Sequence, residues 1–193
     1  MASQLQEQPG GRRPAPGRLE LVQAFVNTND IEQRRDKFET REGMRSWLAD
    51  RRLIDRRDAV SEAAYVRVLE VRESLRSLAL ANNEDDLDRV ALERLNRASR
   101  KSRLYAQFAA GGEAWLEPAD EGVDRALAVL LGIVLEATKD GSWPRMKACR
   151  RDVCRWLYFD RSKARSSVWC SMSQCGNRMK TKAYRRRKGA PDS

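Results

Sequence analysis

Histidine is missing from this chain of 193 residues. Its absence excludes catalytic triads that depend on histidine, histidine general bases and metal sites that need an imidazole ligand. Long apolar runs are missing as well, since no stretch approaches the roughly 20 residues that a membrane-spanning helix needs. The first residues also lack the apolar segment of a secretory signal. We therefore expect a cytoplasmic protein with no membrane partner.

Cysteine is absent from the first 148 residues and then occurs four times, as Cys149, Cys154, Cys170 and Cys175. These form two Cys-x4-Cys pairs joined by a spacer that can fold back, an arrangement typical of a tetrahedral zinc site. In a reducing cytoplasm such pairs are more often metal ligands than disulfides, although two disulfides remain the alternative. Because the chain has no histidine, a zinc site here would be all-cysteine or would recruit a carboxylate.

Positive charge is concentrated in the same part of the chain. Residues 145–188 hold 15 Lys and Arg against 2 acidic residues, a net charge of +13, whereas the remainder holds 23 against 26, a net charge of −3. The two parts account for the overall charge of +10. Such a concentration of positive charge indicates a negatively charged partner and favours nucleic acid.

Apolar residues recur at helical spacing in most of the region before the cysteines. The spacing predicts five helices, in the ranges 19–30, 41–53, 61–81, 84–99 and 121–139. Thr40 and either Asp58 or Ser61 are expected to begin the second and third helices. Alternating residues on both sides of Gly111-Gly112 predict a β-hairpin over 102–118. We therefore expect a mainly α fold with a small β-hairpin, of the α+β class.

No common catalytic motif occurs in this helical region. It lacks a P-loop, a GxGxxG sequence, a nucleophile elbow and an HExxH sequence. Asp85, Asp86 and Asp88 are more simply interpreted as the first turn of a helix than as catalytic carboxylates. We therefore predict that the protein is not an enzyme, and an enzymatic or small-molecule-binding N-terminal domain is the less favoured alternative.

The residues around the cysteines carry a family resemblance. Cys149-x4-Cys154, the segment WLYFDRS, Trp169-Cys170-Ser171-Met172 and Cys175-Gly176-Asn177-Arg178 together resemble the CGNR zinc finger, over about 145–188. The preceding LELVQAFVNTND and SWLADRRLI segments resemble the helical ABATE domain. The resemblance implies a bacterial, stress-linked transcription regulator. It also implies that all four cysteines hold one structural Zn²⁺ in a closed site.

The expected domains follow from this resemblance and from composition. We predict a disordered tail over 1–17, where Gly, Pro and Arg are frequent. An ABATE-like, mainly helical domain is expected over 18–140 and a small treble- or ribbon-like zinc finger ending in a basic helix over 141–189. A short tail is expected over 190–193. Gly176 is expected to allow a tight turn at the last ligand, and Asn177 to cap the basic helix.

The basic helix after the last cysteine is the candidate nucleic-acid interface. Met179 and Ala183 are its expected inward positions, while Arg178 and Arg185 are expected to make the main contacts. The candidate contact residues are Asn177, Arg178, Lys180, Thr181, Lys182, Arg185, Arg186, Arg187 and Lys188. Arg161, Lys163 and Arg165 could flank the DNA groove that this helix would enter.

These residues lead to a first hypothesis, a regulator that binds double-stranded DNA at the nucleoid. A homodimer and a small-molecule effector are both compatible with it. An RNA-binding or ribosome-associated module is the second hypothesis, and a merely solvated basic tail is the alternative to both.

Overall fold

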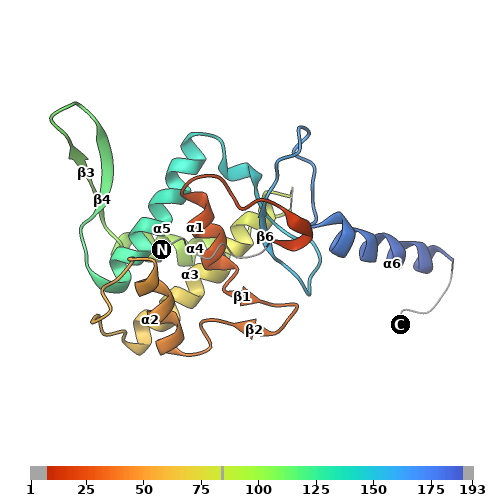
Figure 1. The fold of residues 1–193 in the computed structure, drawn as a ribbon, viewed down its shortest axis with the longest axis horizontal. Helices are drawn as coiled ribbons and strands as arrows, with labels where there is room; N and C mark the ends of the chain where they lie inside the picture. The colour runs from red at the N-terminus through yellow and green to blue at the C-terminus, as the bar shows by residue number, and fades with distance from the viewer. Residues whose placement is uncertain (1–7, 84, 189–193) are drawn as a thin grey trace.

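The computed structural model describes residues 8–83 and 85–188. Short 3-10 turns lie at Pro9–Gly11 and Trp143–Arg145, and a π-helical turn lies at Met172–Gly176. The α-helices are α1 (Leu19–Val26), α2 (Arg41–Asp50), α3 (Glu62–Ala81), α4 (Arg89–Lys101), α5 (Gly122–Lys139) and α6 (Asn177–Arg187). The strands form three antiparallel pairs: β1 (Asn29–Asp30) with β2 (Arg35–Asp36), β3 (Leu104–Phe108) with β4 (Ala114–Pro118), and β5 (Met146–Ala148) with β6 (Leu157–Phe159). The α+β class is confirmed, and α6 projects from one end of the molecule (Figure 1).

The helices α2, α3 and α4 begin after residues whose side chains cap them. The hydroxyl of Thr40 accepts a hydrogen bond from the Gly43 amide, and the hydroxyl of Ser61 accepts one from Ala64. Both contacts satisfy amides that have no partner within the helix. The fourth helix starts later than expected, because Asp88 caps it by accepting from the amides of Val90 and Ala91. Asp85 and Asp86 therefore precede the helix and do not form its first turn.

The hydrophobic core lies between α1, α2, α3 and α5. Phe25, Phe38 and Trp47 form an aromatic cluster in it, with ring centroids 5.5–5.9 Å apart. Val68, Val71 and Leu75 of α3 pack against the same core, as do the apolar residues along α5. No helix in the described part of the chain is both long enough and apolar enough to cross a membrane.

The β3–β4 hairpin confirms the strand prediction but contributes little to the core. Its five residue pairs run from Leu104 opposite Pro118 to Phe108 opposite Ala114. Leu104 packs near Gly132 of α5, whereas Phe108 at the far end is 74% exposed. The hairpin therefore extends from the helices, at the opposite end of the molecule from α6 (Figure 1).

Apolar side chains on both sides of residue 140 share one core. Met146, Ala148, Leu157 and Phe159 of β5 and β6 belong to the same buried cluster as the helices. Buried apolar side chains of this size contribute about 1.5–3 kcal/mol each to folding. The domain boundary at 140 stays a prediction, but the strands beyond it are packed on the helical body.

Polar side chains of the body also bind the backbone of these strands. Asn27 accepts from the Leu157 amide at 2.8 Å and donates to its carbonyl at 2.9 Å. Asn82 donates to the Met146 carbonyl and Asn83 to that of Ala148. A two-stranded sheet leaves its outer backbone groups unpaired, so these amides replace the missing neighbouring strands.

Residues 8–17 are ordered, which corrects part of the expected tail. Gln8 accepts hydrogen bonds from Gln23 of α1 and from the indole of Trp156. Arg12 donates to Ser167 and to the Trp169 carbonyl, and Ala15 is buried. The segment thus lies between the body and the zinc finger, because its polar groups find partners on both. The remainder of the expected tail, 1–7, and the expected tail 190–193 lie outside the described residues.

Candidate metal centre and nucleic-acid interface

The four cysteine sulfurs come together in one buried cluster. All lie within 4.8 Å of one another, with 3.7 Å between the Sγ atoms of Cys154 and Cys170 and 3.6 Å between those of Cys170 and Cys175. Four sulfurs at about 2.3 Å from a tetrahedral zinc ion would be about 3.8 Å apart. A disulfide requires about 2.05 Å, and all four thiols are free. The geometry therefore fits a metal site and not two disulfides.

Short structural elements place each ligand. Cys149 follows β5 and Cys154 precedes β6, whereas Cys170 lies just before the π-helical turn that leads to α6 and Cys175 lies within it. The loop between the first two cysteines closes at Arg155, whose φ of 49° is left-handed. A non-glycine residue in that conformation costs about 1–2 kcal/mol, which the surrounding contacts must offset. The tight turn of the site is thus at Arg155.

Gly176 serves a different purpose from the one the sequence suggested. Its φ and ψ of −62° and −48° are ordinary helical values. A Cβ at this position would lie 2.5 Å from the Met172 sulfur and 3.2 Å from Trp169. A side chain here would displace the end of Met172 and crowd Trp169, so the glycine allows close packing beside the ligands and does not serve a tight turn.

The thiol chemistry of the cluster also favours a cation. Hydrogen bonds from Cys154 and Cys170 lower the pKa of Cys149. The same contact with Cys149 raises the pKa of Cys154, and it also raises that of Cys170. Four neighbouring thiolates repel one another unless a cation lies between them, and a bound Zn²⁺ would supply that charge.

Arg151 places a positive charge beside the sulfurs, in addition to that of a bound Zn²⁺. Its Nη1 lies 3.7 Å from the Cys175 sulfur and 2.6 Å from the Glu32 carboxylate. Contacts of this kind orient a ligand and compensate the negative charge of a four-thiolate site. The side chain therefore connects the metal centre to the body.

A buried ion pair organises the loop that follows β6. Lys147 and Asp160 are almost fully buried, with 3.3 Å between Nζ and Oδ2. Asp160 also accepts from the amides of Ser162 and Ser167. Burial raises the pKa of Asp160, but these hydrogen bonds outweigh it and hold the pKa below its ordinary value. Asp160 and Ser162, at the end of the WLYFDRS segment, thus anchor this loop.

The basic helix starts inside the metal site. The Ser171 hydroxyl accepts from the Gln174 amide and caps the π-helical turn, which continues without a break into α6. Asn177 is therefore not the cap that the sequence predicted. Helix and ligands form one segment, so binding of the metal would fix the start of α6.

All of the candidate contact residues lie on α6 or at its end, and none is buried. Met179 and Ala183 are the least exposed positions, in agreement with their expected inward orientation. Arg161 lies over the Phe159 ring and donates to the Pro14 carbonyl. Arg165 is part of the same exposed loop. Lys163 is exposed as well, and the position of the three residues beside a DNA groove stays a prediction.

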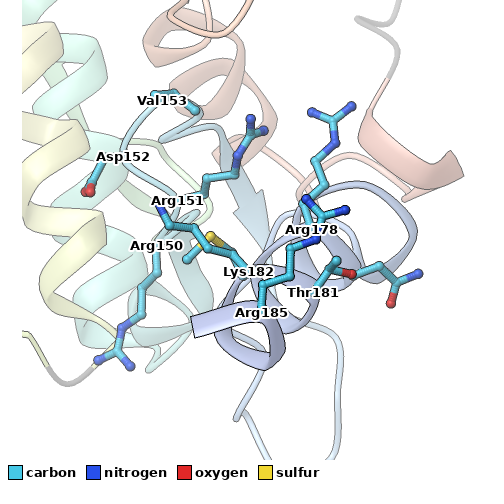
Figure 2. A pocket seen from close by; sticks show the side chains of 10 residues that line it. Arg150, Arg151, Asp152, Val153, Arg178, Thr181, Lys182 and Arg185 are labelled. Atoms are coloured by element: carbon cyan, nitrogen blue, oxygen red, sulfur yellow. The ribbon is translucent and has the colours of Figure 1, made fainter. Parts of the chain in front are cut away.

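A basic groove lies between α6 and the loop from Cys149 to Cys154 (Figure 2). Its volume is about 640 Å³. The helix contributes Arg178, Lys182 and Arg185 together with Asn177 and Thr181. The loop contributes Arg150 and Arg151, which the sequence reasoning missed. Their position inside the CRRDVC ligand segment was the signal that could have identified them.

Two family models match the chain. One, described as a CGNR zinc finger, matches residues 145–188. The other, the ABATE model, described as "Putative stress-induced transcription regulator", matches residues 19–140. No curated protein matches the chain. The family match and the sulfur geometry agree, and the four cysteines form a site for one structural zinc ion.

Proposed function

We propose that this chain, which belongs to the ABATE family and carries a CGNR zinc finger, regulates transcription by binding double-stranded DNA through α6. The observation that supports this proposal best is that no residue of α6 is buried, whereas every strand residue of the same finger is. A DNA-binding function would place the protein in the cytoplasm, at the nucleoid.

The dimensions of α6 suit the major groove. Eleven residues give a length of about 16 Å, and a helix of about 10–12 Å diameter fits a groove about 12 Å wide. Asn177 and Thr181 can donate to and accept from base edges, and Arg178 and Arg185 can bind guanine or phosphate. Lys180, Lys182, Arg186, Arg187 and Lys188 would then contact the phosphate backbone.

The zinc ion has a structural part in this proposal. A site closed by four thiolates leaves no coordination position for water or substrate. Its contribution is to hold the π-helical turn and the Cys149–Cys154 loop together, which fixes α6 at the edge of the body. Removal of the metal would therefore abolish binding by releasing α6.

RNA recognition is the second candidate, and the structure offers it less support. Single-stranded RNA is recognised mainly by stacking of bases on exposed aromatic rings. Trp169 is partly buried against the cysteine cluster. Tyr184 is exposed, but Lys188 lies over its ring, 5.0 Å from the centroid. Duplex DNA therefore fits the available side chains better.

A competition assay tests the proposal. The zinc-loaded full chain is titrated with a random-sequence DNA duplex and with a structured RNA of equal charge, at the same salt concentration. We expect tighter binding to the duplex, and selection from random duplexes should then recover a preferred sequence. Equal or tighter binding to RNA would contradict the proposal and favour the second candidate.

A further inference from the structure

A carboxylate of the body lies against the arginines of the zinc finger. Glu32 belongs to the turn between β1 and β2. That turn is anchored to α3, because Arg72 binds both oxygens of Asp36 at 2.6 and 2.7 Å and Arg76 donates to the Asn29 carbonyl. Both arginine side chains are nearly buried. Glu32 is therefore presented to the finger from a fixed support.

Two guanidinium groups converge on a single oxygen of this carboxylate. Arg151 and Arg178 each place Nη1 2.6 Å from Oε1 of Glu32. Burial raises the pKa of Glu32, but the hydrogen bonds and charges of the two arginines outweigh it and hold the pKa below its ordinary value. The carboxylate is therefore ionised at neutral pH and acts as a bound anion.

We infer that Arg151 and Arg178 form a binding site for one backbone phosphate of DNA, which the Glu32 carboxylate occupies in the free protein. This inference rests on the proposed function. Arginine binds phosphate and carboxylate oxygens with the same charge-assisted geometry, so one can replace the other. Both arginines also line the basic groove beside α6, where a phosphate would approach (Figure 2).

The exposure of the three side chains allows such an exchange. Arg151 is 18% exposed and held beside the Cys175 sulfur, which gives the site a fixed half. Arg178 is 59% exposed, so solvent and ligand can reach it. The pair with Arg178 is the more exposed of the two and contributes only about 0–1 kcal/mol. The pair with Arg151 is less exposed, and a phosphate diester would replace its charge-assisted hydrogen bond. Occupation by DNA would break both contacts between Glu32 and the finger.

A different role for Glu32 predicts the opposite result. If the carboxylate stayed in place and oriented Arg178 toward DNA, its removal would weaken binding. If it competes with phosphate, its removal strengthens binding. The sign of the change in affinity therefore separates the two roles.

The test compares Glu32→Gln with Asp152→Asn in the zinc-loaded full chain. Asp152 lines the same groove, but it pairs with Arg155 and with neither arginine of the site. We expect Glu32→Gln to bind a random-sequence duplex about threefold to tenfold more tightly, at unchanged zinc content. Asp152→Asn should give less than half of that gain. Unchanged or weaker binding by Glu32→Gln, or equal gains in both variants, would overturn the inference.

A probe without DNA separates this inference from the proposed function. Inorganic tripolyphosphate is added to ¹⁵N-labelled protein while backbone amide shifts are recorded. We expect the largest shifts at Arg151 and Arg178, at lower probe concentrations for Glu32→Gln than for the wild type. If the wild type binds no duplex but this pattern appears, DNA binding fails and the phosphate site stands. Without the pattern the phosphate site is disproved, even if duplex binding is observed.

Discussion

The zinc finger has one side built from β5 and β6 and another built from α6. Every residue of the two strands is buried, and body side chains such as Asn27 and Asn83 bind their backbone. No residue of α6 is buried, and four consecutive cationic residues, Arg185 to Lys188, lie at its end. Folding thus accounts for the residues of the strands but not for those of α6. Under the proposed function, a DNA partner would account for the basic side chains of the helix.

The largest effect is expected from loss of the zinc site, which connects the strands β5 and β6 to α6. Cys170→Ser should eliminate stoichiometric zinc, because one ligand of a closed four-thiolate site is lost. Structural zinc contributes on the order of 10 kcal/mol to the folding of such modules. Since β5 and β6 share the core of the body, we expect the whole chain to unfold at a lower temperature. Elemental analysis and calorimetry measure both effects.

A calorimetric trace with two separate transitions would contradict that expectation. In that case the body would unfold at the wild-type temperature after the finger had already melted. The control is Ser99→Ala, at an exposed position of α4, which should leave the zinc content and the melting temperature unaltered.

The second-largest effect is a loss of stability expected on the buried side of the finger, at β5 and β6. Asp160→Asn leaves the buried ammonium of Lys147 without its counter-charge. Removing one partner of a buried ion pair lowers the free energy of unfolding by about 3–5 kcal/mol. Urea denaturation should show this loss, whereas Asp86→Asn at an exposed position should stay within about 0.5 kcal/mol of the wild type. Equal stabilities of the two variants would show that the pair does not organise the loop.

A smaller effect is expected from the contact between body and strands. Asn27→Ala removes the side chain that accepts from the Leu157 amide and one of the two amides that donate to its carbonyl, which keeps its contact with Gln23. Buried backbone groups that lose a partner cost about 1–3 kcal/mol. Asn96→Ala, on the exposed face of α4, is the matched control and should have almost no effect. If both variants unfold at the same urea concentration, the strands do not depend on the body.

The smallest effect on stability is expected at α6. Replacement of Arg185, Arg186, Arg187 and Lys188 by Gln keeps a similar helix propensity. These side chains are exposed, so the free energy of unfolding should change by no more than about 0.5 kcal/mol. A large loss of stability would show that the basic residues serve folding and would remove the contrast between the two sides.

The sequence was sufficient where the relevant contacts are local. Thr40 and Ser61 cap the helices because each bonds to an amide three residues away, a distance that the sequence displays directly. The cysteine spacing likewise identified a cluster that depends on two short loops. The presence of the helices and of the β3–β4 hairpin follows from the periodicity of apolar residues.

Contacts between distant segments could not be read in the same way. Glu32 and Arg178 are 146 positions apart, and nothing in either segment indicates the other. Leu87 and Val90 fit the apolar pattern of a helix yet are exposed; Leu87 precedes α4, and Val90 lies in its first turn. Residues 8–17 were expected to be disordered from their composition, but Gln8 and Arg12 find partners on α1 and on the finger.

The salt dependence of duplex binding tests the central claim most directly. The logarithm of the binding constant should fall linearly with the logarithm of salt concentration, with a slope of about −0.9 for each phosphate neutralised. The Gln variant of Arg185 to Lys188 should retain its zinc and stability but show a slope smaller in magnitude by up to about 3–4. A flat response in the wild type, or the same slope in both proteins, would contradict recognition of DNA by α6.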